Sequence, residues 1–259
     1  MRMMKKVLGT VTVLALSVSL LAGCGSTAVS PVSSTASTAA ESTTSSVVSE
    51  TTSAAADENA AAAAQLLNDL TGSYQELWPV ILADEYQQTW LDDCTALVGE
   101  ENAEAAFEKL SSMVTSDVYG EDAVEAYANG GGAYFCGFTN SLATLTFDGE
   151  TSTISGTDKD GNVLFSHTYH YIGMEPVHGL YEFQSDDADS GEFTYFFLAP
   201  DTSAETYHIE FRYGSDAEAL SQYDTGEYAY WLASGISTDC DQTMIDNCIE
   251  LFCTENLAG

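Results

Sequence analysis

His208 and Glu210 are the two residues whose types and spacing best suit them to bind a metal ion together. One residue separates them, in a segment from Thr206 to Tyr213 whose β-branched and aromatic residues predict a strand. Side chains two positions apart on a strand project from the same face, so an imidazole and a carboxylate could share one divalent ion. A polar pair on a solvated strand face has the same pattern, and these residues alone leave both interpretations open.

The other three histidines do not extend this pair in the sequence. His167 and His170 are three residues apart on an expected strand, so their side chains should project to opposite faces and cannot chelate together. His178 follows Pro176 in an expected loop. Metal binding through histidine therefore rests on the 208–210 pair.

The cysteines fit no known zinc motif. Seven residues separate Cys240 from Cys248 and four separate Cys248 from Cys253, which matches no zinc knuckle or finger. Five cysteines lie beyond position 24, so they cannot all pair within one chain. Cys248 is expected on the apolar face of a helix, as a small buried hydrophobe. The five are predicted to be core residues or disulfide partners, in a pairing that the sequence does not specify: Cys94, Cys136, Cys240, Cys248 and Cys253.

The sequence carries no signature of nucleophilic or zinc-hydrolase catalysis. It lacks the Gly-x-Ser-x-Gly and His-Glu-x-x-His patterns, and no cysteine has a papain-like context. Acidic residues are so numerous that a catalytic pair cannot be distinguished from chance neighbours. The acidic run from Asp186 to Asp189 lacks the spacing of an EF-hand calcium loop. We therefore expect a protein that is not an enzyme.

The charge balance excludes several classes of partner. The 259 residues include 6 Lys and Arg against 40 Asp and Glu, a net charge of −34. Three of the six cations are Arg2, Lys5 and Lys6; without them, 3 basic residues face 40 acidic ones, a balance of −37. Such a chain repels phosphate, so nucleic acid is not an expected partner. A hydrophobic fraction of 45% nevertheless predicts a folded core.

The N-terminal residues resemble a bacterial lipoprotein leader. Residues 1–23 form a basic start and an apolar stretch too short to span a bilayer, and they end in Leu-Ala-Gly before Cys24, which is similar to a lipobox. This resemblance implies a signal peptide, a diacylated Cys24 and a chain held by lipid on the extracytoplasmic side of the cell membrane. Residues 24–56 are Ser/Thr/Ala-rich and predict a flexible tether. An ordinary signal peptide with an incidental cysteine is the alternative.

Residues 57–259 predict one domain of the α+β class. Apolar spacing predicts helices at residues 60–70, near Pro79, at 103–113 and 123–128, and in a final helix around 244–252. Between them, turn signals such as Asp148-Gly149 and Asp160-Gly161 connect short apolar runs. An antiparallel meander of about seven strands closing into a small β-barrel, with helices packed at its N- and C-terminal ends, is therefore expected. The predicted strands are 133–139, 142–147, 151–155, 163–171, 180–184, 193–198 and 206–213.

Several segments, in the same order and with similar spacing, resemble the ZinT family. The first reads LTGSYQELWPVIL at residues 70–82; later ones are Ala126–Gly131, Gly179–Phe183, Leu198–Pro200 and His208–Gly214, followed by Trp231 and the final helix. The resemblance spans about Leu66 to Leu257. It implies a calycin-like (lipocalin-like) extracytoplasmic zinc-binding domain, and a metal-uptake ABC transporter as a partner.

The resemblance also implies a set of ligands. The family holds zinc through three histidines, of which one precedes an Ala-Pro-like turn and two form His-x-His. In this sequence Phe196 occupies the first position, His208 matches the second, and Glu210 replaces the third. His178 or Glu205 could complete the coordination sphere. The predicted cofactor is therefore zinc, held by His208 and Glu210.

Two functions follow as hypotheses. The first is a membrane-anchored lipoprotein that binds or sequesters a divalent metal, zinc above all, and feeds metal uptake. The second is a metal-free ZinT-like surface module for a small ligand or a protein partner, which the phenylalanine at position 196 favours. In this second hypothesis alternating aromatic residues line an apolar cavity, although they could equally form the barrel core: Tyr195, Phe197, Tyr207 and Phe211.

Overall fold

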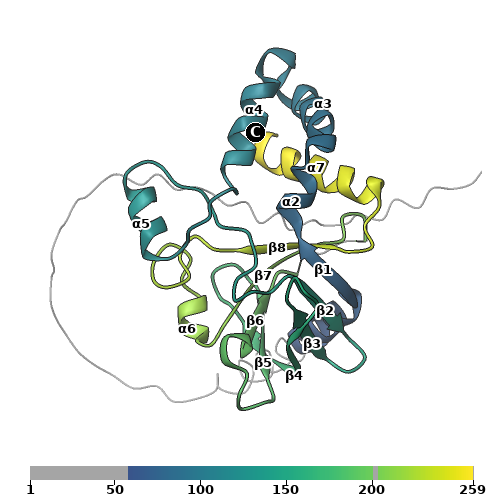
Figure 1. Cartoon of the computed structure of the whole chain (residues 1–259), viewed down its shortest axis with the longest axis vertical. Coiled ribbons are helices and arrows are strands. Elements are labelled where there is room, and N and C mark those ends of the chain that lie inside the picture. The colour runs from purple at the N-terminus through teal and green to yellow at the C-terminus, as the bar shows by residue number, and fades with distance from the viewer. Residues whose placement is uncertain (1–57, 201–203, 259) are drawn as a thin grey trace, which may run out of the picture.

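The domain is a closed β-barrel of eight antiparallel strands. The computed structural model describes residues 58–200 and 204–258. Each strand pairs with the next along the chain, and β1 pairs with β8 to close the barrel (Figure 1). The predicted α+β barrel is confirmed. The strands are β1 Gly72–Glu76, β2 Thr144–Asp148, β3 Thr153–Thr157, β4 Val163–Met174, β5 Tyr181–Ser185, β6 Tyr195–Leu198, β7 His208–Gly214 and β8 Ala233–Ser237.

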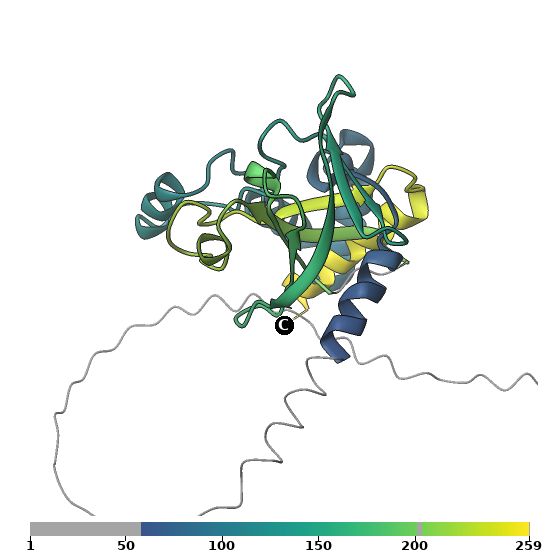
Figure 2. The ribbon, with the colours of Figure 1, turned by 90° about the horizontal axis from the view of Figure 1, so that it is seen from below.

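Helices cover the barrel at its two ends and on one side. Residues 58–69 form the first helix, whose apolar face joins the barrel core through Leu66 and Leu67; Figure 2 shows this helix beside one end of the barrel. A second group packs on the outside of β8, and α5 and α6 lie apart from it (Figure 1). The remaining helices are α2 Leu77–Ile81, α3 Gln87–Val98, α4 Glu100–Ser112, α5 Glu121–Ala128, α6 Ala217–Leu220 and α7 Gln242–Leu257, with 3-10 turns at Asp84–Tyr86 and Gly191–Phe193.

The barrel interior is filled by aromatic and aliphatic side chains. Phe196, Phe211 and Tyr213 are fully buried, and the Phe196 ring lies 6.3 Å from that of Phe211 and 5.4 Å from that of Tyr213. Small barrels of eight strands have an interior just wide enough for side chains to fill. The inward aromatic residues of β6 and β7 are thus part of the core.

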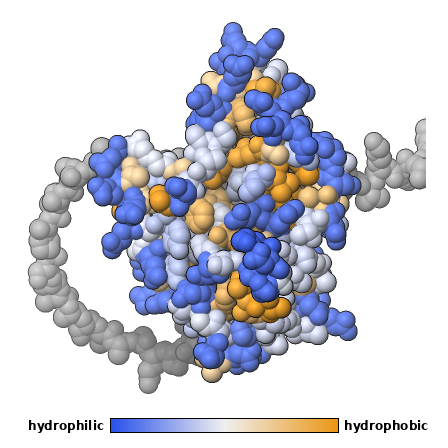
Figure 3. Space-filling model, viewed as in Figure 1, coloured by the Kyte–Doolittle hydropathy of each residue, from blue (hydrophilic) through white to orange (hydrophobic). Residues whose placement is uncertain are grey.

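A second core lies outside the barrel, between β8 and the helices α2, α3, α4 and α7. It is built around Trp78, Trp90 and Ile249, and it meets the barrel wall at Ile236 of β8. The Phe252 ring of α7 packs edge-on against Trp78 at 4.7 Å and Trp90 at 6.0 Å. Figure 3 shows hydrophobic residues where the helices meet the barrel, and hydrophilic residues over the outer tips of the helices.

Two strands were missed in the sequence and one was predicted wrongly. β1 and β8 lie where no strand was expected, whereas residues 133–139 make only isolated bridges at Phe135. β8 reads Ala-Ser-Gly-Ile-Ser, and its first four residues are buried because helices cover the outer face. A strand of small residues that is buried on both faces shows no polar–apolar alternation, so its sequence does not reveal it.

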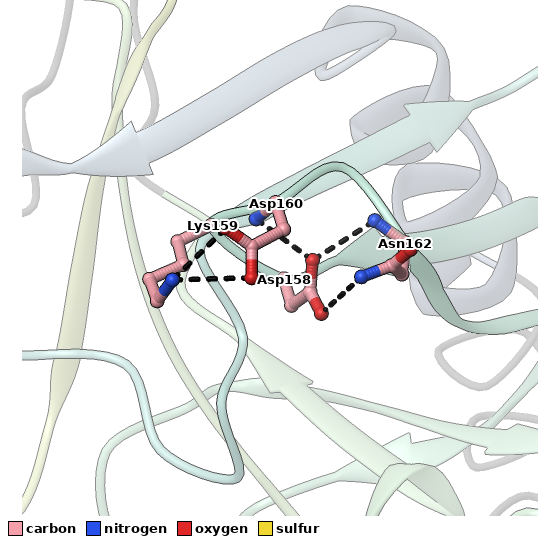
Figure 4. Close-up of polar contacts among 4 residues, drawn as sticks. All are labelled: Asp158, Lys159, Asp160 and Asn162. Carbon is pink, nitrogen blue, oxygen red and sulfur yellow. Dashed lines mark hydrogen bonds and ion pairs between the residues drawn. The ribbon is translucent and has the colours of Figure 1, made fainter.

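The predicted turn at Asp160-Gly161 is confirmed between β3 and β4. Asp158 holds this turn (Figure 4): its Oδ1 accepts hydrogen bonds from the backbone N–H groups of Asp160 and Asn162, both at 2.9 Å. Its Oδ2 accepts from the Asn162 side chain at 2.9 Å, and these bonds lower the pKa of Asp158. Gly161 adopts φ 80°, a conformation that favours glycine. The carboxylate thus serves the turn.

Arg212 anchors the connection between β7 and β8. Its side chain is fully buried, and its guanidinium donates hydrogen bonds to the backbone oxygens of Leu220, Gln222 and Tyr228. The guanidinium carbon also lies 4.2 Å from the centre of the Tyr223 ring. Burial lowers the pKa of Arg212. One buried cation therefore gathers three carbonyl groups of a connection that has little regular structure of its own.

No helix within residues 58–200 and 204–258 is long and apolar enough to cross a membrane. The predicted signal peptide, residues 1–23, the lipidation site Cys24 and the predicted tether, residues 24–56, lie outside the described residues.

Candidate metal site beside strand β7

His208 and Glu210 project from the outer face of the barrel, toward α2 and α7. Along β7, Ile209 and Phe211 are buried in the barrel core, whereas His208 and Glu210 are half-buried. β8 lies on one side of them, with Glu210 opposite Ser234. The expected common face of the two side chains is therefore present, and it faces the helical layer.

These two side chains border a small cavity between β7 and the helices. Its volume is about 30 Å³, more than the roughly 10 to 15 Å³ that one water molecule requires, so water or an ion has room there. The walls are aliphatic and aromatic on the side of α2, and mixed on the side of α7. The lining residues are Leu77, Trp78, Ile81, His208, Glu210, Cys248, Leu251, Phe252 and Glu255.

The orientation of the His208 ring is set by Thr206. The imidazole Nδ1 lies 2.8 Å from the Thr206 hydroxyl oxygen. With Nδ1 protonated and donating to that hydroxyl, Nε2 carries the lone pair that a metal ion requires. Histidine ligands in proteins are commonly held this way, by a hydrogen bond from the second ring nitrogen.

Cys248 is a weaker donor than its position suggests. Its thiol donates a hydrogen bond to the Thr206 carbonyl oxygen at 3.1 Å, and burial raises its pKa to about 12. Zinc binds the thiolate, so a thiol with this pKa stays protonated at neutral pH unless a metal displaces its proton. Burial and the negative charge of Glu210 likewise raise the pKa of the neighbouring Cys136 thiol.

The donors border one cavity but do not form a closed coordination sphere. Among residues 58–200 and 204–258, no group of three or more His, Cys, Asp or Glu side chains is placed to hold a metal ion. The donor types, an imidazole and two carboxylates, are those that zinc takes. A cation at this cavity would therefore be held by few protein ligands, with water completing its coordination.

Position 196 is not beside this site, so no residue there could serve as its third ligand. It pairs with Tyr213 across β6 and β7, and paired residues share a face of the sheet. That face is the barrel interior, opposite the face that carries His208 and Glu210. Phe197 pairs with Arg212, so position 197 is the one on the outer face. The position that the resemblance gave to the first histidine, 196, therefore lies on the face of the sheet opposite His208 and Glu210.

The other predicted candidates do not line the cavity. The His178 ring packs on Tyr223 at 3.7 Å, and its Nδ1 lies 3.5 Å from the carboxylate of the fully buried Glu175. The backbone oxygen of Glu205 accepts a hydrogen bond from Asn247, the residue before Cys248. Neither His178 nor Glu205 is among the lining residues of the cavity.

His167 and His170 each face a separate aspartate. His167 Nδ1 lies 2.7 Å from Asp187, and His170 Nδ1 lies 2.6 Å from Asp186. The two imidazoles thus belong to two separate pairs, as their spacing on a strand predicted. Both aspartates belong to the acidic run from Asp186 to Asp189, which lacks the spacing of a calcium loop.

Glu255 is the donor that was missed in the sequence. It lies on α7, 45 positions after Glu210, and only the folded chain brings the two to one cavity. A signal was present nevertheless: Glu255 follows Cys248 by seven residues, which is two helical turns and hence the same face. A polar residue in register with an apolar helix face marks such a position.

Comparisons with known proteins identify a similar fold. No family model matches the chain, and no curated protein matches it. Among solved structures, the Zn(II)-bound ZinT-like domain of Streptococcus pneumoniae AdcA is similar with a TM-score of 0.45 and 15% identity, over 71% of this chain and 89% of that domain. Zn(II)-bound AdcA of the same organism matches with a TM-score of 0.42 and 14% identity, over 72% of this chain and 35% of AdcA. Likeness at this level assigns no family, ligand or partner to this chain.

Proposed function

We propose that this protein binds a divalent cation, zinc above all, in the cavity between β7 and α7. The observation that carries the proposal is that His208, Glu210 and Glu255 border one cavity of about 30 Å³, which has room for an ion. An imidazole and carboxylates are a donor set that suits zinc. The imidazole is also oriented by Thr206 in the way that metal-binding histidines are.

The binding should be weak and reversible. The Cys248 thiol is held protonated, and the remaining donors do not converge in a ready sphere. The net charge of −34 concentrates cations near the surface and speeds their capture. A site of this kind suits capture and release of a metal. It does not suit a structural role, because both cores are packed from side chains.

The cellular setting is part of the same proposal. Residues 1–23 direct export, Cys24 carries the lipid, and residues 24–56 extend the domain from the membrane surface on the extracytoplasmic side. The protein acts there without catalysis, and it passes its metal to an ABC transporter. Labelling with a radioactive fatty acid tests the anchor, since a Cys24→Ala variant should incorporate none.

Calorimetric titration with zinc tests the binding site. The full chain in detergent at pH 7 should bind one zinc ion with a dissociation constant of about 10 to 100 μM. The double variant His208→Ala with Glu210→Gln should lose this binding. The matched control is His170→Ala, which removes an exposed imidazole that faces Asp186. A wild-type constant weaker than about 100 μM, or equal binding in the double variant, would exclude the site.

A metal-free binding module is the second candidate, and one observation favours it. The described residues hold no preassembled group of three metal-binding side chains. In that case the protein recognises a small ligand or protein partner through its surface. Elemental analysis of the purified chain separates the two candidates, because a metal-free protein with a co-purified organic compound would support the module.

A further inference from the structure

Two cysteines face each other between α3 and α7. The sulfur atoms of Cys94, on α3, and Cys253, on α7, are 3.9 Å apart. Both side chains are fully buried. They are separated by 159 positions in the chain, so their meeting is a product of the fold. The thiols lie in the second core, where the two helices pack against each other (Figure 1).

The geometry is close to that of a disulfide. A disulfide bond is about 2.0 Å long, so the two sulfurs need to approach by about 1.9 Å from their separation of 3.9 Å. Rotation of the two side chains, with a small shift of the helices, can supply this distance. Trp90 and Phe252, neighbours of the two cysteines, already pack edge to face with ring centres 6.0 Å apart. This ring contact holds α3 and α7 together beside the two cysteines.

The remaining cysteines of the described part have other surroundings. Cys248 donates to the Thr206 carbonyl, and Cys136 is buried beside Glu210. Cys240 is half-buried after β8. Five cysteines therefore divide into one facing pair and three single thiols, which accounts for the odd number.

We propose that Cys94 and Cys253 form a disulfide bond that joins α3 to α7 while the chain folds. The oxidant is a disulfide, either of a small thiol such as glutathione or of a thiol oxidoreductase. One cysteine thiolate attacks that disulfide and releases one reduced thiol. The second cysteine then displaces the other, and the Sγ–Sγ bond forms. The two cysteines lose two protons and two electrons, and the oxidant becomes two thiols.

The bond must form before the two helices finish packing. Burial raises the pKa of both thiols, so the folded protein holds very little of the thiolate that exchange requires. The surrounding side chains also leave no path for an oxidant, because both cysteines are fully buried. A chain that folds in the reduced state should therefore remain a dithiol for a long time under the same oxidant.

This proposal rests on the proposed export only for the source of the oxidant. Its test is made in a defined glutathione buffer and does not involve zinc. Absence of the disulfide would not exclude zinc binding, and absence of zinc binding would not exclude the disulfide, so the two failures are distinguishable.

Refolding followed by peptide mapping tests the pairing. The full chain is unfolded, reduced, refolded in reduced and oxidised glutathione, and then denatured and alkylated. A protease that cuts after glutamate is suitable, because Glu250 and Glu255 flank Cys253 and separate it from Cys248. The expected product is a cross-linked peptide containing Cys94 and Cys253. Alkylation of both Cys94 and Cys253, or a dominant bond between any other pair, would overturn the proposal.

Timing and stability supply independent measurements. Chain folded without oxidant and then placed in the same buffer should form the bond at least about 100-fold more slowly than the unfolded chain. Oxidised wild type should melt about 10 °C above reduced wild type, since the bond closes a long loop. This difference should vanish in Cys94→Ala and in Cys253→Ala, and persist in the control Cys240→Ser. Equal melting of oxidised and reduced wild type would contradict the bond.

Discussion

Replacement of Arg212 by methionine should destabilise the domain more than any change at an exposed cation. The guanidinium is fully buried and donates to the carbonyl oxygens of Leu220, Gln222 and Tyr228. Methionine fills much of the same volume but donates no hydrogen bond. The variant therefore leaves three carbonyl groups of the β7–β8 connection without their donor.

The size of the effect follows from these contacts. Each buried carbonyl left without a partner costs about 1 to 3 kcal/mol. Relaxation of the connection, and relief from burying a charge, reduce the sum, so about 3 to 5 kcal/mol is expected. A domain of this size loses about 2 to 4 °C in Tm for each kcal/mol, which gives a fall of roughly 10 °C. The stability of Arg212→Lys should lie between those of wild type and Arg212→Met, because one ammonium group cannot reach all three oxygens.

Urea unfolding followed by circular dichroism measures this free energy. The control is Lys159→Met, which removes a cation whose side chain is 83% exposed and should change stability by less than about 0.5 kcal/mol. The reasoning would be refuted by an Arg212→Met variant within about 1 kcal/mol of wild type. That result would mean that water replaces the guanidinium at the three oxygens.

Three further predictions concern the cavity and the core. Zinc affinity should fall as the pH drops below about 6.5, where an imidazole becomes protonated and cannot bind metal; titrations between pH 5 and 8 measure this. Glu255→Gln should weaken zinc binding about tenfold, whereas Glu250→Gln, on the same helix but not among the residues that line the cavity, should not. Equal dissociation constants for wild type and Glu255→Gln would exclude Glu255 as a ligand. Burial raises the pKa of Tyr74 to about 12. Because a raised pKa favours the neutral phenol in the folded state, stability from this group is complete below about pH 10 and is lost as the pH rises toward 12. Urea midpoints across this range should fall less steeply in Tyr74→Phe than in wild type.

The sequence predicted the middle of the barrel well, because its strands show period-two patterns and clear turns. β2 to β7 each overlap a predicted strand, and Asp160-Gly161 is a turn that short-range chemistry specifies. β1 and β8 were missed because their burial depends on the tertiary structure. β1 has one buried residue, Tyr74, and β8 is buried on one face by the barrel core and on the other by helices from elsewhere in the chain. Such burial arises only when the sheet and the helices pack together, so the local sequence pattern does not predict it.

The candidate site shows the same division. The common face of His208 and Glu210 follows from the period of a strand, so the sequence was sufficient for it. Which side of the sheet that face occupies depends on how β6 and β7 align, and this register placed Phe196 on the opposite face. Glu255 needed a further step, since its helix had to be docked against β7 before the two elements could share a cavity.

The helix α7 connects the two proposals through its geometry. Cys248 and Glu255 are two turns apart and face the cavity, whereas Cys253 faces α3. Glu255 follows Cys253 by two residues, so the rotation and translation of this part of α7 decide how near its carboxylate comes to Glu210. A bond at Cys253 would restrict that motion. In the structure with both thiols reduced, the metal-binding side chains do not converge. Zinc titrations of the oxidised and the reduced protein therefore compare the site with α7 restrained by the bond and with α7 unrestrained.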